Sequence, residues 1–155
     1  MEEKFLEAIL PAAWRVLAAA LFVTASPARA EAPLPVTQVK VAGHALRVEV
    51  AATMEQRGRG LMFRETLAKD AGMLFVFEDP GYHAMWMKNT PLPLSVAFID
   101  GEGRILNIVD MEPQTLDSHA AAGPARYAVE TNKGWFRDRR IKAGDKVTGL
   151  PKPPG

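Results

Sequence analysis

A short polar cluster, Lys88, Asn89 and Thr90, offers the clearest opportunity for ligand chemistry in this sequence. These three hydrogen-bonding side chains follow the indole of Trp86, at the end of a predicted strand. Binding pockets commonly combine an apolar wall with a few convergent polar groups. The cluster therefore predicts a small-molecule site at residues 86–90. In a simpler interpretation, Lys88 is solvated and its two neighbours satisfy backbone groups in the turn before Pro91.

Arg64 is a further candidate for the same site. It follows an apolar patch at residues 61–63 and could reach an anionic group, because the guanidinium fits a carboxylate or phosphate bidentately. With Arg64 included, the predicted ligand is small and polar or anionic. Alternatively, Arg64 pairs with a surface carboxylate such as Glu65 or Glu78.

Thioether and imidazole groups suggest a second chemistry. If residues 82–88 form a strand, His83, Met85 and Met87 project from one face. Such soft ligands suit Cu(I), so a soft-metal site is an alternative function. Methionine is also an ordinary core residue, and packing is the competing interpretation. No other metal and no cofactor is predicted.

A hydrolytic enzyme with an unidentified catalytic group is another alternative, and whether the protein is an enzyme stays open. Asp117, Ser118 and His119 are adjacent in sequence, but a catalytic triad requires side chains brought together by the fold. The chain lacks the nucleophile-elbow, zinc-protease and phosphate-loop motifs. It also lacks cysteine, which excludes disulfides, cysteine-based zinc sites and thiol catalysis.

These side chains must be positioned by a mainly β fold. Period-2 alternation and apolar runs predict short strands at residues 36–41, 45–51, 73–77, 82–88, 94–99, 104–109, 127–131 and 146–148. A turn is predicted at 79–81 and a loop at 111–124. Thr53 and Gln56 form a predicted capping box for one short helix, and Asn132 is the predicted cap of another ending near Ile141. Seven or eight mostly antiparallel strands predict a small sandwich or barrel, without the helix–strand alternation of α/β folds.

The first 30 residues resemble a signal peptide. Residues 16–25 form an apolar run shorter than the roughly 20 residues that span a bilayer, and residues 28–30 give an A-x-A cleavage signal. The acidic residues before this run are atypical of a signal peptide. The alternative is an uncleaved N-terminal helix, amphipathic or anchoring, and a start codon assigned too far upstream would also explain these residues. A linker at 31–35, a domain at 36–149 and a proline-rich tail at 150–155 would follow. The protein is therefore predicted to be periplasmic or secreted, without a membrane span after cleavage.

The charge balance argues against some partners. The chain has 19 basic and 18 acidic residues, a net charge of +1. Nothing in this balance suggests nucleic acid or a membrane surface as a partner. We expect a monomer with a small-molecule ligand.

Several motifs together resemble the family called domain of unknown function 192. They are RGLMFR at 59–64, GMLFVF at 72–77, WMKNT at 86–90, FID at 98–100 and IKAGDKV at 141–147, and the match covers about residues 36–148. The resemblance implies a compact, mainly β fold, often behind an export signal, and it implies no activity. It also implies that WMKNT, with Trp86, Lys88, Asn89 and Thr90, belongs to the family signature. Met85 stands where an aromatic residue is expected, so the metal hypothesis gains no support from the family.

Overall fold

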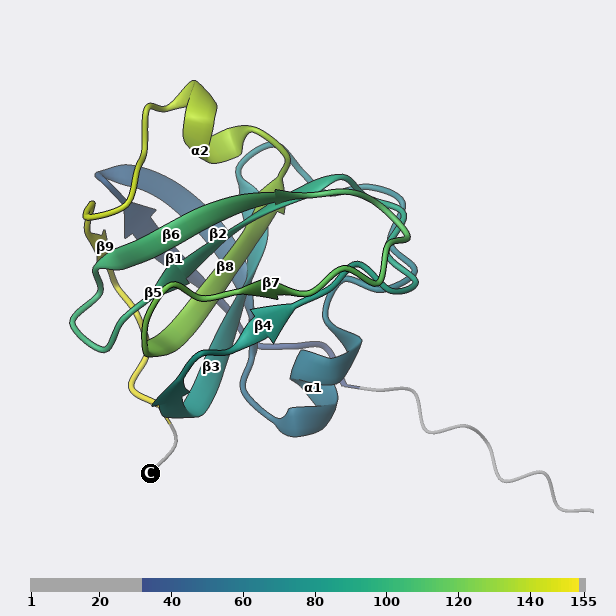
Figure 1. Cartoon of the computed structure of the whole chain (residues 1–155), viewed down its shortest axis with the longest axis horizontal. Coiled ribbons are helices and arrows are strands. Elements are labelled where there is room, and N and C mark those ends of the chain that lie inside the picture. The colour runs from purple at the N-terminus through teal and green to yellow at the C-terminus, as the bar shows by residue number, and fades with distance from the viewer. Residues whose placement is uncertain (1–31, 154–155) are drawn as a thin grey trace, which may run out of the picture. The chain divides into compact units, whose positions relative to one another are not determined.

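The computed structural model describes residues 32–153, and the predicted signal peptide lies outside this described part (Figure 1). The fold of the described part is mainly β, as predicted. Its elements are β1 (Val36–Val41), β2 (His44–Ala51), α1 (Met54–Arg59), β3 (Ala71–Gly81), β4 (Ala84–Met85), β5 (Leu94–Ile99), β6 (Ile105–Met111), β7 (His119–Ala120), β8 (Ala125–Asn132), α2 (Trp135–Asp138) and β9 (Val147–Thr148). They belong to one compact unit, Ala32–Gly155.

Seven strands form one curled sheet in the order β6-β5-β8-β3-β2-β1-β9, and β4 pairs with β7 in a separate two-stranded sheet. The two edges of the large sheet meet at one end. There, the Val147 amide donates to the Gly103 carbonyl (2.7 Å), and the Ile105 amide donates to the Asp145 carbonyl (2.9 Å). An antiparallel bridge between Arg104 and Lys146 completes this contact. The sheet therefore closes toward a small barrel.

The pairing of β2 with β3 is parallel, whereas the other strand pairs of the described residues are antiparallel. A parallel pair requires a crossover connection, and α1 lies within this one. The predicted capping box is present. The Thr53 hydroxyl accepts from the Gln56 amide, and the Gln56 side-chain oxygen accepts from the Thr53 amide, both at 3.1 Å. This helical crossover between parallel strands differs from the mostly antiparallel arrangement expected from the sequence.

The predictions for residues 79–88 are wrong in two respects. The predicted turn at 79–81 lies within β3, where the register with β8 shifts between Val76 and Gly81. The predicted strand at 82–88 is reduced to β4, because its second half leaves the ladder. The Met87 amide donates to Thr115 (3.2 Å), and the Thr90 amide then closes a turn onto Met87 (3.2 Å). The partner of β4 is β7, which lies inside the predicted loop at 111–124.

The prediction that Asn132 caps a helix is also wrong. β8 continues through Asn132, whose side-chain amide donates to the backbone oxygens of Leu67 (2.9 Å) and Ala68 (3.2 Å). The chain turns instead at Gly134, whose positive φ of 87° suits glycine, and the helix α2 ends at Asp138 rather than near residue 141.

Alternating side chains of β3 enter two separate apolar clusters. Leu74 and Val76 belong to the inner cluster inside the curled sheet. Met73, Phe75 and Phe77 belong to an outer cluster on the opposite face of the strand. The element α1 and the small sheet of β4 and β7 lie over this outer face (Figure 1). This second layer positions the candidate site.

Candidate functional site

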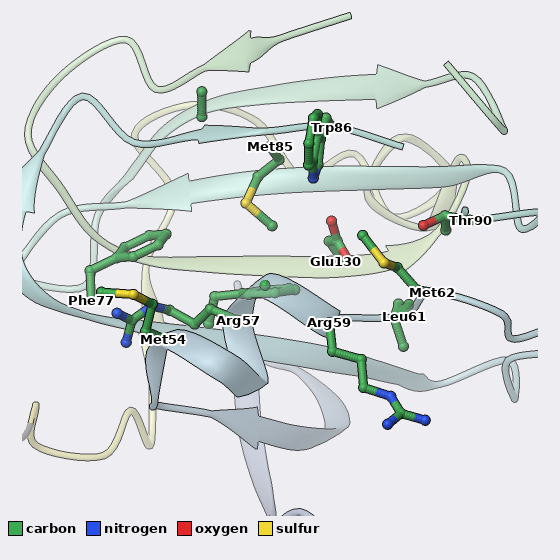
Figure 2. Close-up of a pocket in the computed structure, with 13 residues that line it drawn as sticks. Met54, Arg57, Arg59, Leu61, Met62, Phe77, Met85, Trp86, Thr90 and Glu130 are labelled. Atoms are coloured by element: carbon green, nitrogen blue, oxygen red, sulfur yellow. The ribbon is translucent and has the colours of Figure 1, made fainter. Parts of the chain in front are cut away.

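A cavity of about 250 Å³ lies between α1, β3 and the segment that begins with β4 (Figure 2). Its walls are largely apolar, with thioether and aromatic side chains, and three charged side chains line it. The lining residues include Met54, Arg57, Arg59, Met62, Phe75, Phe77, Met85, Trp86, Thr90 and Glu130. Such a composition, an apolar wall with a few polar groups, is typical of small-molecule sites.

Glu130 is the most unusual residue of this cavity. It is only 4% exposed, and its neighbours across the sheet are Met73 on β3 and Val96 on β5. Figure 2 shows its carboxyl group directed into the space near Met62 and Trp86. Within residues 32–153, this carboxyl makes no hydrogen bond and no ion pair. Burial raises the pKa of Glu130 from 4.5 to about 8.

The backbone of Glu130 is held close to β3 by a glycine. A Cβ atom at Gly72 would lie 2.3 Å from the Glu130 carbonyl oxygen, so no larger residue fits without moving a strand. Sequence reasoning missed Glu130 as a site residue. The available signal was its position in β8, where Tyr127 and Val129 face the inner cluster while Ala128 and Glu130 face the outer one.

Arg57 fixes the helical wall of the cavity. Its guanidinium donates to the backbone oxygens of Ala52 and Val76 and lies 5.9 Å from the centre of the Phe77 ring. A distant contact to the Glu78 carboxylate, at 3.9 Å, adds to these bonds. Arg57 therefore joins α1 to β3 and leaves a positive charge beside the cavity.

The predicted cluster at residues 86–90 divides between the cavity and the turn. Trp86, 49% exposed, and Thr90, 4% exposed, line the cavity, whereas Lys88 and Asn89 do not. The Lys88 ammonium lies 5.3 Å from the centre of the Trp86 ring, within cation–π range. The Thr90 hydroxyl donates to the Lys88 carbonyl (3.0 Å), so it stabilises the turn as well as lining the cavity.

Asn89 connects this turn to the segment after α1. Its φ of 52° is left-handed, and its carbonyl oxygen accepts a hydrogen bond from the Phe63 amide (2.8 Å). Phe63 also has a left-handed φ, 64°, and its side chain is 70% exposed. A bulky residue in this region is strained, and such strain is frequent near functional sites. The contact holds Met62 and Trp86 on the same side of the domain.

Arg64 is not among the residues that line the cavity. Its guanidinium binds the Glu49 carboxylate on β2 through two bonds of 2.6 Å. The hydrogen bond from Arg64 lowers the pKa of Glu49, and the same bond raises the pKa of Arg64. The partner differs from the Glu65 or Glu78 considered above, because the fold brings β2 beside this segment.

His83 makes a ring contact, whereas Met85 and Met87 both contact the outer cluster. The His83 ring stacks on Phe77 at 3.7 Å, and its Nε2 is 2.9 Å from the Asp79 carbonyl oxygen. Met85 lines the cavity, and Met87 is fully buried in the outer cluster. Among residues 32–153, no group of three or more histidine, cysteine, aspartate or glutamate side chains could hold a metal ion.

The chain resembles two solved structures. A proposed transcription regulator from Sinorhizobium meliloti 1021 is 35% identical, with a TM-score of 0.73 over 76% of this chain and 96% of that one. A protein of unknown function from Novosphingobium aromaticivorans DSM 12444 is also 35% identical, with a TM-score of 0.71 over 80% of this chain and 97% of that one. The comparison with curated proteins finds no significant match.

Two further findings concern membrane helices and the family. The described residues contain no helix that is long and apolar enough to cross a membrane. The family model described as DUF192, an uncharacterized ACR, matches residues 37–149, as the motifs predicted. The chain therefore belongs to the domain of unknown function 192 family.

Proposed function

We propose that this domain binds a small molecule in the cavity between α1 and the β4 segment, with Glu130 as the polar anchor. The observation that carries the proposal is a buried carboxyl group that faces a cavity without a partner among the described residues. Burying such a group without a hydrogen bond costs free energy, and proteins rarely leave it unsatisfied. A ligand that bonds to Glu130 would remove this cost.

The walls indicate the remaining chemistry of the ligand. Phe75, Phe77 and Trp86 offer ring surfaces, and Met62 and Met85 offer adaptable thioethers. A volume of about 250 Å³ is below the usual range of drug-sized pockets, so the ligand would be small. The ligand is therefore a compact molecule with an apolar body and one hydrogen-bonding group.

Methionine methyl signals provide a direct test. The full-length protein, labelled with methyl-¹³C methionine, would be screened by NMR against a library of small metabolites. The signals would be assigned by replacing single methionines with leucine. A ligand in the cavity should shift the signals of Met62 and Met85 and should leave the signal of the buried Met111 in place.

Two exposed aromatic residues provide matched variants for this screen. Trp86→Ala should abolish the ligand-induced shifts, because Trp86 lines the cavity. Tyr82→Ala should not, because Tyr82 is 71% exposed and is not a lining residue. If every library compound leaves Met62 and Met85 unshifted, or if both variants behave alike, the cavity is not a binding site.

Acid–base catalysis in the same cavity is a second candidate function, favoured by the pKa of Glu130. A carboxyl group with a pKa of about 8 can accept or donate a proton near neutral pH. Turnover of small ester or amide substrates should then be lost in Glu130→Gln and kept in the exposed control Glu65→Gln. Turnover that survives in Glu130→Gln would exclude Glu130 as the catalytic group.

The leader supports a proposed location outside the cytoplasm. If the signal peptide is cleaved after Ala30, the mature protein begins at residue 31. Cell fractionation and intact mass measurement should find that mature form in the periplasm or the medium. A full-length mass in the cytoplasmic fraction would refute the proposed export.

A further inference from the structure

The protonation state of Glu130 limits which ligands can bind it. Glu130 is 4% exposed as a residue, and its neighbours on β3 and β5, Met73 and Val96, are apolar. An ionised carboxylate without a cation or a hydrogen-bond donor is very costly in such surroundings, so the group keeps its proton at neutral pH. A protonated carboxyl donates a hydrogen bond through its O–H. Its natural ligand partner is therefore an acceptor oxygen.

The charged groups around the cavity are positive. From α1, Arg57 and Arg59 line it; β3 contributes Phe75 and Phe77, and the β4 segment contributes Ala84, Met85 and Trp86. The strand β5, which pairs with β8 at Glu130, carries no ionisable residue. Lys88 adds another cation beside Trp86. The printed bonds of Arg57 go to Ala52 and Val76 rather than to Glu130, and its positive charge favours an anion in the cavity.

We propose that the ligand is a small monocarboxylate with an apolar body, and that protonated Glu130 donates a hydrogen bond to the carboxylate of this ligand. This proposal rests on the binding function proposed above. The two carboxyl groups then share one proton, in a charge-assisted bond that is stronger than a neutral one. The apolar body lies against Phe75 and Trp86, and the nearby positive charge of Arg57 favours the remaining negative charge.

This arrangement makes binding depend on pH in one direction. When Glu130 loses its proton, the two carboxylates repel each other and the donor is lost. With a pKa of about 8, about nine-tenths of Glu130 is protonated at pH 7 and about one-tenth at pH 9. The affinity for a carboxylate should therefore be about tenfold weaker at pH 9 than at pH 7.

Two probes with the same carbon skeleton test the proposal. 3-Phenylpropionate and 3-phenylpropylamine would be titrated into the full-length protein at pH 6, 7, 8 and 9, with the Met62 and Met85 methyl signals as the readout. The carboxylate should bind more tightly at pH 7 and weaken about tenfold by pH 9. The amine should bind more weakly at pH 7.

Two variants of Glu130 distinguish the loss of its titratable proton from the loss of the folded structure. Glu130→Gln still donates from its amide, so it should bind 3-phenylpropionate severalfold more weakly, with an affinity that no longer changes with pH. Glu130→Leu should lose binding, and its methyl spectrum would show whether it is folded. Glu65→Gln, at an exposed position, should keep the pH dependence of the parent chain.

The alternative results are distinguishable. Tighter binding of the amine, with an affinity that rises with pH, would overturn the carboxylate proposal and leave the binding function intact. Unchanged affinity of the parent chain for the carboxylate from pH 6 to 9 would also overturn it. If neither probe shifts Met62 or Met85, the carboxylate proposal fails, and only the wider screen then decides whether the cavity binds anything.

Discussion

Replacing Glu130 by glutamine should change how the stability of this protein depends on pH. In the folded state the pKa of Glu130 is about 8, raised by burial from 4.5. Between these two values the folded state holds a proton that the unfolded state has released. The free energy of unfolding should therefore fall as pH rises through this range, and glutamine, which does not titrate, should remove that contribution.

The size of the effect follows from the two pKa values. Each pH unit within the range changes the free energy of unfolding by about 1.4 kcal/mol. Between pH 5 and pH 7.5 the free energy of unfolding of the parent chain should fall by about 3 kcal/mol relative to that of Glu130→Gln. Below pH 4.5 both states are protonated and the difference is constant, and above about pH 8 both are ionised and it is constant again. The lowered pKa values of Glu49 and Asp70 act at more acidic pH, outside this range.

Urea unfolding of the full-length protein, followed by tryptophan fluorescence at half-unit pH intervals from 4 to 9, measures this difference. The quantity of interest is the pH slope of the difference between parent and variant, because the pH-independent cost of burying an amide then cancels. Glu65→Gln, at an exposed position, should run parallel to the parent. Parallel curves for the parent and Glu130→Gln between pH 5 and 8 would show that Glu130 is not a buried, unpartnered carboxyl.

Three further predictions concern local contacts of β2, β3 and α1. Gly72→Ala would place a methyl group 2.3 Å from a backbone oxygen of β8 and should cost about 2 kcal/mol or more in urea unfolding, whereas Gly58→Ala, which meets nothing within 4 Å, should stabilise α1 by about 0.5–1 kcal/mol. Equal effects would contradict the close approach. Thr53→Ala removes the capping box and should cost about 1 kcal/mol in the same assay, and no loss would show that the cap is not needed. A double-mutant cycle on Arg64 and Glu49 should give a coupling below about 1 kcal/mol that weakens in salt, because both groups are partly exposed. A larger or salt-independent coupling would contradict this.

Local sequence signals predicted much of the sheet. The alternation at residues 45–51 identified β2, and the Asp100–Gly103 turn separated two strands that the structure pairs as β5 and β6. The capping box at Thr53 identified the start of α1. These features depend on residues within a few positions of one another, so periodicity and capping chemistry were sufficient.

The candidate site depended on contacts between distant segments and was predicted only in part. Of the predicted cluster, Trp86 and Thr90 line the cavity, whereas Lys88 and Asn89 belong to the turn beside it. Glu130 is flanked by β3 and β5 and faces a cavity whose other walls are α1 and the β4 segment, all of them far from it in sequence. The alternation of β8 assigns Glu130 to the outer face, but it does not show that other segments cover that face.

The meeting of the two sheet edges bears on self-association. Exposed edge strands offer unpaired amides and carbonyls to a second chain, and this is a common route to aggregation. Here, the amides of Val147 and Ile105 donate to the carbonyls of Gly103 and Asp145, so these edge groups are paired within the same chain. At that end of the sheet, a neighbouring molecule finds no free strand to extend. The protein can thus present an apolar cavity and exposed aromatic side chains without also presenting a template for intermolecular strand pairing there.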